Sequence, residues 1–240
     1  MRPLRAVLGL YVLAWLRSRG PWIWLALAAA VIWYDLEIGA NAGPWWSVWV
    51  SASMLAGFLA GYDTYTRLRE DGSVRLLLLQ PARRGVVALS FWIAAGLLSA
   101  GMMLVFLVYL IIVGRAPVTP ELAVAAAFVW VGSLGFVAYA QLGSLLLPRD
   151  AVAVAGLLVI VLGAGPLERW LPDAAPEWVR MLVGAIEYAI PMGARVTDLL
   201  AGSPATPAAL GTVLLQILVV IAAIRAILSR PRIIARRGQT

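Results

Sequence analysis

Residues 67–84 read RLREDGSVRLLLLQPARR, and this polar stretch lies between two hydrophobic segments that are each long enough to cross a lipid bilayer. An acidic pair, a Gly-Ser break, a run of four leucines, a proline and a basic pair follow one another within it. A leucine face beside charged residues is typical of an amphipathic helix, and a proline commonly ends one. The stretch therefore predicts a short amphipathic helix, on the cytoplasmic side, between two membrane crossings.

The composition of the whole chain agrees with a membrane location for the flanking segments. Of the 240 residues, 62% are hydrophobic and 13% are charged, whereas an average soluble domain has about 25% charged residues. The apolar residues come in blocks separated by Pro, Gly and charge, as expected for helices of roughly 20 residues that span the hydrocarbon core. We therefore expect a membrane protein with several crossings.

Three residue types are absent from the sequence, and their absence excludes several kinds of site. The chain has no His, no Cys and no Lys, because all 19 basic residues are Arg. Without Lys it cannot form a Walker A phosphate loop, and without His or Cys it cannot form a zinc site, an axial His haem ligand or a Ser-His-Asp triad. We therefore expect no catalytic residue, no metal site and no enzymatic activity of this chain by itself.

The hydrophobic blocks predict an all-α membrane protein that forms a single domain over residues 1–240. Six crossings are expected, at residues 21–38, 45–62, 86–113, 121–147, 151–165 and 208–228. Around them we expect an interfacial elbow helix at 1–19, a cytoplasmic segment at 63–85, an external segment at 166–207 with short interfacial or re-entrant helices, and a basic tail at 229–240. A signal peptide at the N-terminus is the competing interpretation, but Trp15, Arg17 and Arg19 lie where a small-residue cleavage site would be.

The distribution of arginine predicts which side each loop occupies. Fifteen arginines fall on the face that carries both termini and the 63–85 segment, and four fall on the opposite face. Cytoplasmic loops carry the excess of basic residues, so we expect both termini in the cytoplasm and a multi-pass protein of a prokaryotic inner membrane. The net charge of +7 is then a topology signal, and no nucleic-acid partner is expected.

Polar residues within the crossings are few, and they are candidates for a transport pathway because their burial in hydrocarbon is costly. The candidates are Gln141, its neighbour Ser144, and Gln216. Because serine can bond to the backbone of its own helix, the two glutamines are the stronger of the three. Hydrogen bonding between helices without a substrate role is the favoured interpretation even for these. Gly57 and Gly61 form a small-xxx-small pair, which predicts close helix packing.

The polar stretch resembles the cytoplasmic coupling segment of ABC-2 type transporter permeases, in which the same elements recur in the same order. The residues that carry the resemblance, and to which it assigns contact with an ATPase subunit, are Arg69, Glu70, Asp71, Gly72, Ser73, Leu77, Pro81, Arg83 and Arg84. The resemblance implies a permease that exports a hydrophobic or amphipathic substrate. It also implies a second permease chain, surrounding membrane lipids, and separate ATPase subunits that bind ATP and Mg²⁺, with no cofactor on this chain.

The external segment adds a weaker likeness to the same family. Glu187, Tyr188 and Pro191 resemble its pattern of a Tyr or Leu before a Pro and a short helix, which makes them candidates for an external gate. For Glu187, an ion pair with Arg180 or Arg195 is favoured over binding of a cation or a substrate amine.

Other functions stay open at this point. Within the family, the permease of the cytochrome c maturation system has a similar length and the same Asp-Gly-Ser before a Leu-rich run. From another class, the chain could be a membrane anchor or assembly subunit that transports nothing and recruits a cytoplasmic partner. An intramembrane enzyme is disfavoured because acid-base groups are sparse in the crossings.

Overall fold

The structure is a computed structural model, and it is described for part of the chain. The described residues are 8–9, 11–13, 15–16, 20–34, 36–37, 45–62, 64–65, 84–148, 150–154, 171–172, 175–182 and 207–229. These residues form helices and short connections and contain no strand. The expectation of an all-helical chain is therefore confirmed for the described part.

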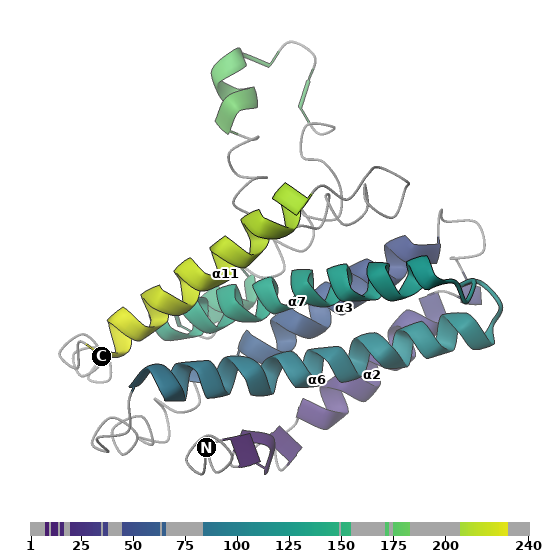
Figure 1. Cartoon of the computed structure of the whole chain (residues 1–240), viewed down its shortest axis with the longest axis horizontal. Coiled ribbons are helices and arrows are strands. Elements are labelled where there is room, and N and C mark those ends of the chain that lie inside the picture. Colours follow the sequence, from purple (N-terminus) through teal and green to yellow (C-terminus); the bar gives the residue numbers. More distant parts are fainter. Residues whose placement is uncertain are drawn as a thin grey trace.

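Five long helices fill most of this part (Figure 1). They are α2 (Gly20–Tyr34), α3 (Trp45–Tyr62), α6 (Arg84–Ile112), α7 (Pro120–Leu146) and α11 (Pro207–Leu228). Helix α3 has the bounds that the sequence predicts, and α6, α7 and α11 begin and end within two residues of the predicted crossings. The predicted crossing at 151–165 is described only to residue 154, and the 166–207 segment and the tail are described only in small part.

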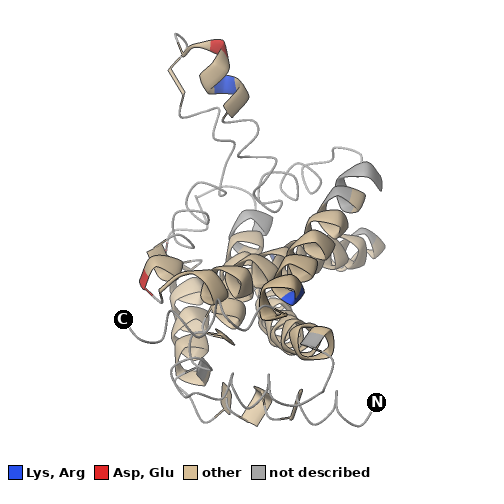
Figure 2. Cartoon of the chain, turned by 90° about the vertical axis from the view of Figure 1, so that its left-hand side faces the viewer, with Lys and Arg blue, Asp and Glu red and all other residues tan. Residues whose placement is uncertain are grey.

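Two of the helices are long and apolar enough to cross a membrane. One is the 28-residue stretch Gly85–Ile112 of α6, and the other is the 25-residue stretch Leu122–Leu146 of α7. Three further apolar stretches are shorter, namely Pro21–Tyr34, Trp49–Tyr62 and Val213–Leu228. Figure 2 shows that nearly all of the described ribbon carries uncharged residues. These features agree with a helical membrane protein, while the number of crossings stays a prediction.

Local sequence explains how α6 and α7 are joined. Gly114 has φ +75°, a conformation that residues with a Cβ rarely adopt, and it turns the chain directly after α6. Thr119 is extended before Pro120, and Pro120 begins α7 because a helix's first turn needs no backbone N–H from it. At the other end, Leu147 is extended because it precedes Pro148, which stops the helix.

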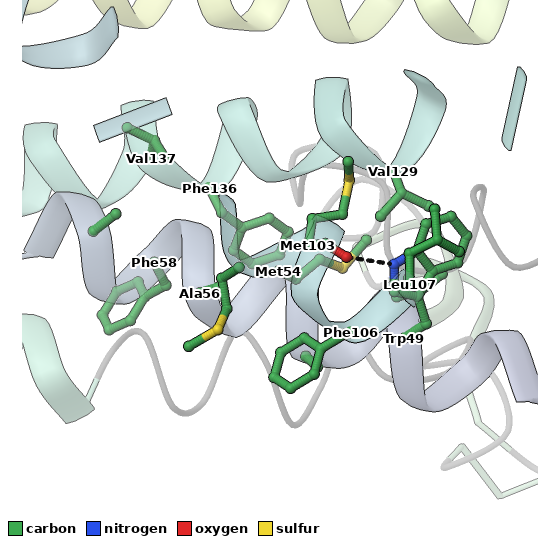
Figure 3. Packing of buried hydrophobic residues seen from close by; sticks show 14 of the residues in the cluster. Trp49, Met54, Ala56, Phe58, Met103, Phe106, Leu107, Val129, Phe136 and Val137 are labelled. Carbon is green, nitrogen blue, oxygen red and sulfur yellow. Dashed lines mark hydrogen bonds between the residues drawn. The ribbon is translucent and has the colours of Figure 1, made fainter. Parts of the chain in front are cut away.

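The core of the described part lies among α3, α6, α7 and α11, and α2 packs at the edge of this bundle against α3 and α6. Figure 3 shows the indole of Trp49 pointing from α3 to α6, where its N–H donates to the Met103 carbonyl oxygen at 3.3 Å. Helices α6 and α7 run antiparallel and exchange similar bonds, from the Trp92 indole to the Leu134 carbonyl and from the Trp130 indole to the Gly96 carbonyl. Tryptophan N–H groups thus link neighbouring helices of the bundle.

Large apolar side chains also cover the outside of the bundle. On α6, the exposed fractions of these side chains run from 40% for Leu89 to 78% for Ile112. On α11, Leu215 and Leu218 are 61% and 63% exposed. A helix that is apolar on every side either lies in the middle of a large protein or faces lipid, and the exposed faces of α6 and α11 fit contact with lipid.

Candidate functional site

Several residues that the sequence singles out lie outside the described residues. Those of the polar stretch are Arg69, Glu70, Asp71, Gly72, Ser73, Leu77, Pro81 and Arg83, and those of the external segment are Glu187, Tyr188 and Pro191. Arg84 is described only as the first residue of α6. The assigned contacts of these residues therefore stay predictions, and the described site is the part of the bundle from which residues 66–83 depart and to which they return.

A compact apolar cluster lies at this place, and we call it the root cluster. Its members are Tyr65, Val87, Ala88, Phe91, Ala138, Leu145, Val220, Ile224 and Leu228. Tyr65 directly precedes the 66–83 segment and is 1% exposed, and its ring meets the edge of the Phe91 ring at 5.8 Å between centroids. Phe91 lies two turns into α6, the helix that follows the segment. A residue before the segment therefore packs against a residue of the helix after it.

Tyr65 is also joined to α7 through its backbone. Its N–H donates to Ser144 Oγ at 3.3 Å, and that hydroxyl donates to the Gln141 carbonyl oxygen at 2.9 Å. Burial raises the pKa of the Tyr65 phenol, and the neighbouring Tyr11 raises it further. Tyr65 is therefore a neutral, buried residue that links the end of α3 to α6 and α7.

Two glycines of α3 that precede Tyr65 bring α3 and α7 together. A Cβ on Gly57 would lie 2.5 Å from the Ser133 carbonyl oxygen, and one on Gly61 would lie 2.6 Å from that of Val137. Both sets of residues advance by four, so the two helices run parallel and meet backbone to backbone along one line, which we call the glycine seam. The predicted close packing by this glycine pair is confirmed.

The N-terminal segment, described at residues 8–9, 11–13 and 15–16, is fastened to the same end of α3. The Tyr11 hydroxyl donates to the Ala60 carbonyl oxygen at 2.7 Å and lies 3.2 Å from Thr64 Oγ1. Its ring packs on Phe91 at 5.6 Å between centroids. Nothing in the sequence singled out Tyr11 or Tyr65, because both contacts join residues far apart in the chain.

The buried serines bond to their own helices, as the sequence predicts. Ser53 donates to the Trp49 carbonyl, Ser90 to that of Val86 and Ser133 to that of Trp130, at 2.6–2.8 Å. The Ser99 hydroxyl donates to Ser133 Oγ at 2.9 Å and adds one bond between α6 and α7. Serine in this bundle therefore serves packing and helix contacts.

Gln141 differs from the serines. It is 0% exposed on α7, and neither its amide oxygen nor its amide nitrogen has a hydrogen-bond partner among the described residues. Ser144 is brought next to it by the bond described above, while Gln216 lies half-buried on α11. An amide buried in this way costs about 1–3 kcal/mol, so Gln141 is the most unusual polar residue of the described bundle.

The described residues contain no group of three or more His, Cys, Asp or Glu side chains that could hold a metal ion. No family model matches this sequence, and no curated protein matches it. The functional interpretation therefore rests on the sequence of the polar stretch and on the packing of the described residues that flank it.

Proposed function

We propose that this chain is the permease subunit of an ABC-2 type exporter of the prokaryotic inner membrane, driven by separate ATPase subunits that bind residues 66–83. Its cargo would be hydrophobic or amphipathic, since the exposed surfaces of the bundle are apolar. The observation that carries the proposal is that residues on either side of the 66–83 segment, Tyr65 before it and Val87 and Phe91 after it, pack in one cluster.

This arrangement would pass a push on the segment to several helices at once. Tyr65 bonds to Ser144 of α7, and the glycine seam holds α3 and α7 together beyond it. Gly85, near the start of α6, lies against the side chain of Arg225 on α11, with a Cβ there only 3.3 Å from Arg225 Cδ. Closure of ATPase subunits against the segment would thus move α3, α6, α7 and α11 as a connected unit.

The packing inside one copy supports a second permease chain in the assembly. Trp49, Phe106 and Val129 are 0–1% exposed and fill the space between α3, α6 and α7. A route for an apolar cargo would therefore lie between two copies, or between this chain and a paralogue, and the buried Gln141 and Ser144 would act within the bundle.

The proposal is tested by purifying the tagged chain from its own host membranes in mild detergent and assaying the complex for ATP hydrolysis. We expect a Walker A subunit to co-purify, and we expect the double change Glu70→Ala and Asp71→Ala to lower its stimulated ATPase activity at least several-fold. Asp150→Ala is the matched control, because Asp150 is an exposed acidic residue outside the segment.

Each alternative predicts a different result. A stable chain that co-purifies with no ATPase would overturn the proposal and favour the membrane anchor. An ATPase partner whose activity is the same in the double variant and in the Asp150 control would show that the acidic pair has no part in coupling.

A further inference from the structure

Helix α11 carries a single charged residue, Arg225, in its last turn. The exposed face that leads up to Arg225 is uncharged and contains residues at steps of three and four, namely Gly211, Leu214, Leu218 and Ala222. Residues with this spacing lie on one side of a helix. Arg225 is therefore the charged end of an exposed apolar stripe, which we call the α11 stripe.

The side chain of Arg225 lies across the start of α6. A Cβ on Gly85 would be 3.3 Å from Arg225 Cδ, 3.4 Å from its Nε and 3.9 Å from its Cγ. The methylene stem and the nearest guanidinium nitrogen therefore pack on the backbone of a residue that has no side chain. We call this contact the arginine seat.

Among the described residues, the Arg225 guanidinium has no anionic partner. No ion pair or hydrogen bond joins it to any of them, and the first turn of α6 contains no acidic residue. Arginine is effectively always charged in proteins, and its planar group presents several N–H donors. An anion that pairs with Arg225 must therefore come from outside the described residues.

The arginine seat lies where the apolar stretches of both helices end. Gly85 is the first residue of the apolar stretch Gly85–Ile112, and α11 ends at Leu228. The two helices run in opposite directions, so the start of α6 and the end of α11 lie at the same end of the bundle (Figure 1). Further into the bundle, Leu89 on α6 is 40% exposed and Leu218 on α11 is 63% exposed. A cation that is followed along both helices by exposed apolar side chains matches the order of a phospholipid, in which a phosphate precedes the acyl chains.

We propose that the arginine seat and the α11 stripe bind one anionic phospholipid of the cytoplasmic leaflet. The Arg225 guanidinium donates to the phosphate oxygens, a pairing that its planar group can make with two N–H groups at once. The acyl chains lie along the α11 stripe and Leu89. The predicted excess of arginine on this side of the membrane favours a lipid with a net negative charge over a zwitterionic one. A lipid in this place joins the start of α6 to the end of α11, whether or not an ATPase subunit is bound.

The test is native mass spectrometry of the purified chain in detergent, titrated with phosphatidylglycerol or with phosphatidylcholine of the same acyl chains. We expect the unsubstituted chain to bind its first phosphatidylglycerol more tightly than its first phosphatidylcholine. Arg225→Gln should weaken binding of that phosphatidylglycerol by about tenfold, which is the size of one hydrogen bond to a charged group. An excess of inorganic phosphate should leave the bound lipid in place, because a free anion makes no contact with the α11 stripe.

Two further variants separate the arginine seat from a general attraction of lipid to a basic chain. Gly85→Leu leaves every charge in place but fills the space of the Arg225 stem, so we expect the same loss of affinity as for Arg225→Gln. Arg232→Gln is the matched control, because it removes one positive charge from the 229–240 tail on the same predicted side of the membrane. We expect this variant to bind phosphatidylglycerol as the unsubstituted chain does.

An unchanged affinity in Arg225→Gln or Gly85→Leu, or an equal loss in Arg232→Gln, would overturn the proposal. Release of the lipid by inorganic phosphate would assign Arg225 to a free anion instead, and a pair of chains that only Arg225→Gln separates would assign this face to a second copy. If Gly85→Leu fails to fold, the comparison of Arg225→Gln with Arg232→Gln still decides between these results. The measurement needs no ATPase subunit, so its result is independent of whether such a subunit co-purifies.

Discussion

At the scale of single residues, the buried polar groups divide into those with partners and those without. Ser133 belongs to the first kind, since it donates to the Trp130 carbonyl and accepts from Ser99. Gln141 belongs to the second, since both atoms of its amide lack a partner among the described residues. Equal burial therefore has opposite consequences for stability at these two positions.

We expect Gln141→Leu, a change of similar volume, to stabilise the chain by about 1–3 kcal/mol, because it removes a buried amide that gains no bond. We expect Ser133→Ala to destabilise it by about 0.5–1.5 kcal/mol, because it strands the Ser99 hydroxyl. Thermal unfolding in detergent, followed by circular dichroism, measures both. Loss of stability in Gln141→Leu would mean that the amide has a polar partner in the membrane, which would restore it as a pathway candidate.

At the scale of helices, the glycine seam is the tightest approach that the structure describes between α3 and α7. Gly61 has no room for a Cβ, because backbone atoms of Val137 occupy the place. Gly101 on α6 has nothing within 4 Å of the same position. Gly61 and Gly101 therefore allow the same substitution to be compared at a crowded and at an open position of the bundle.

We expect Gly61→Ala to destabilise the chain by about 1–3 kcal/mol, because the two backbones would have to separate. Gly101→Ala should be neutral or stabilising by up to about 1 kcal/mol, since alanine is the better helix former. Unfolding midpoints of the two variants in the same detergent measure the difference. Equal midpoints would show that α3 and α7 are not held together at Gly61.

The helices and the seam are the parts that sequence patterns could predict. Long apolar runs ended by Pro and Gly fix the bounds of α6 and α7 to within two residues, and the spacing of Gly57 and Gly61 marks the seam. The Tyr11 bond could not be predicted, because it joins side chain and backbone 49 residues apart. The isolation of the Gln141 amide could not be predicted either, since it depends on which groups the neighbouring helices present to it.

At the scale of the whole molecule, the ends of the bundle give a test of topology. Ser229 directly follows α11, and Val118 lies in the turn between α6 and α7, where it is 78% exposed. The arginine distribution predicts that Ser229 lies in the cytoplasm and Val118 outside. The two positions therefore should differ in their access to a reagent that cannot cross the membrane.

We expect a cysteine in place of Val118 to react with a membrane-impermeant maleimide in intact spheroplasts, and one in place of Ser229 to react only after permeabilisation. Because the chain has no cysteine of its own, the unsubstituted chain is the control for background labelling. The reverse pattern would invert the assigned orientation and would leave residues 66–83 on the wrong side for an ATPase.

The parallel packing of α3 and α7 also has a consequence for folding during synthesis on the ribosome. Gly57 and Gly61 meet Ser133 and Val137, so each glycine waits for a partner that is synthesised 76 residues later (133 − 57 and 137 − 61). At about 5–20 residues per second, the nascent α3 would spend roughly 4–15 s with this face uncovered. During that interval the uncovered face of α3 would contact the insertion machinery or lipid. A pause in translation before α7 emerges would lengthen the time in which this face can bind other proteins.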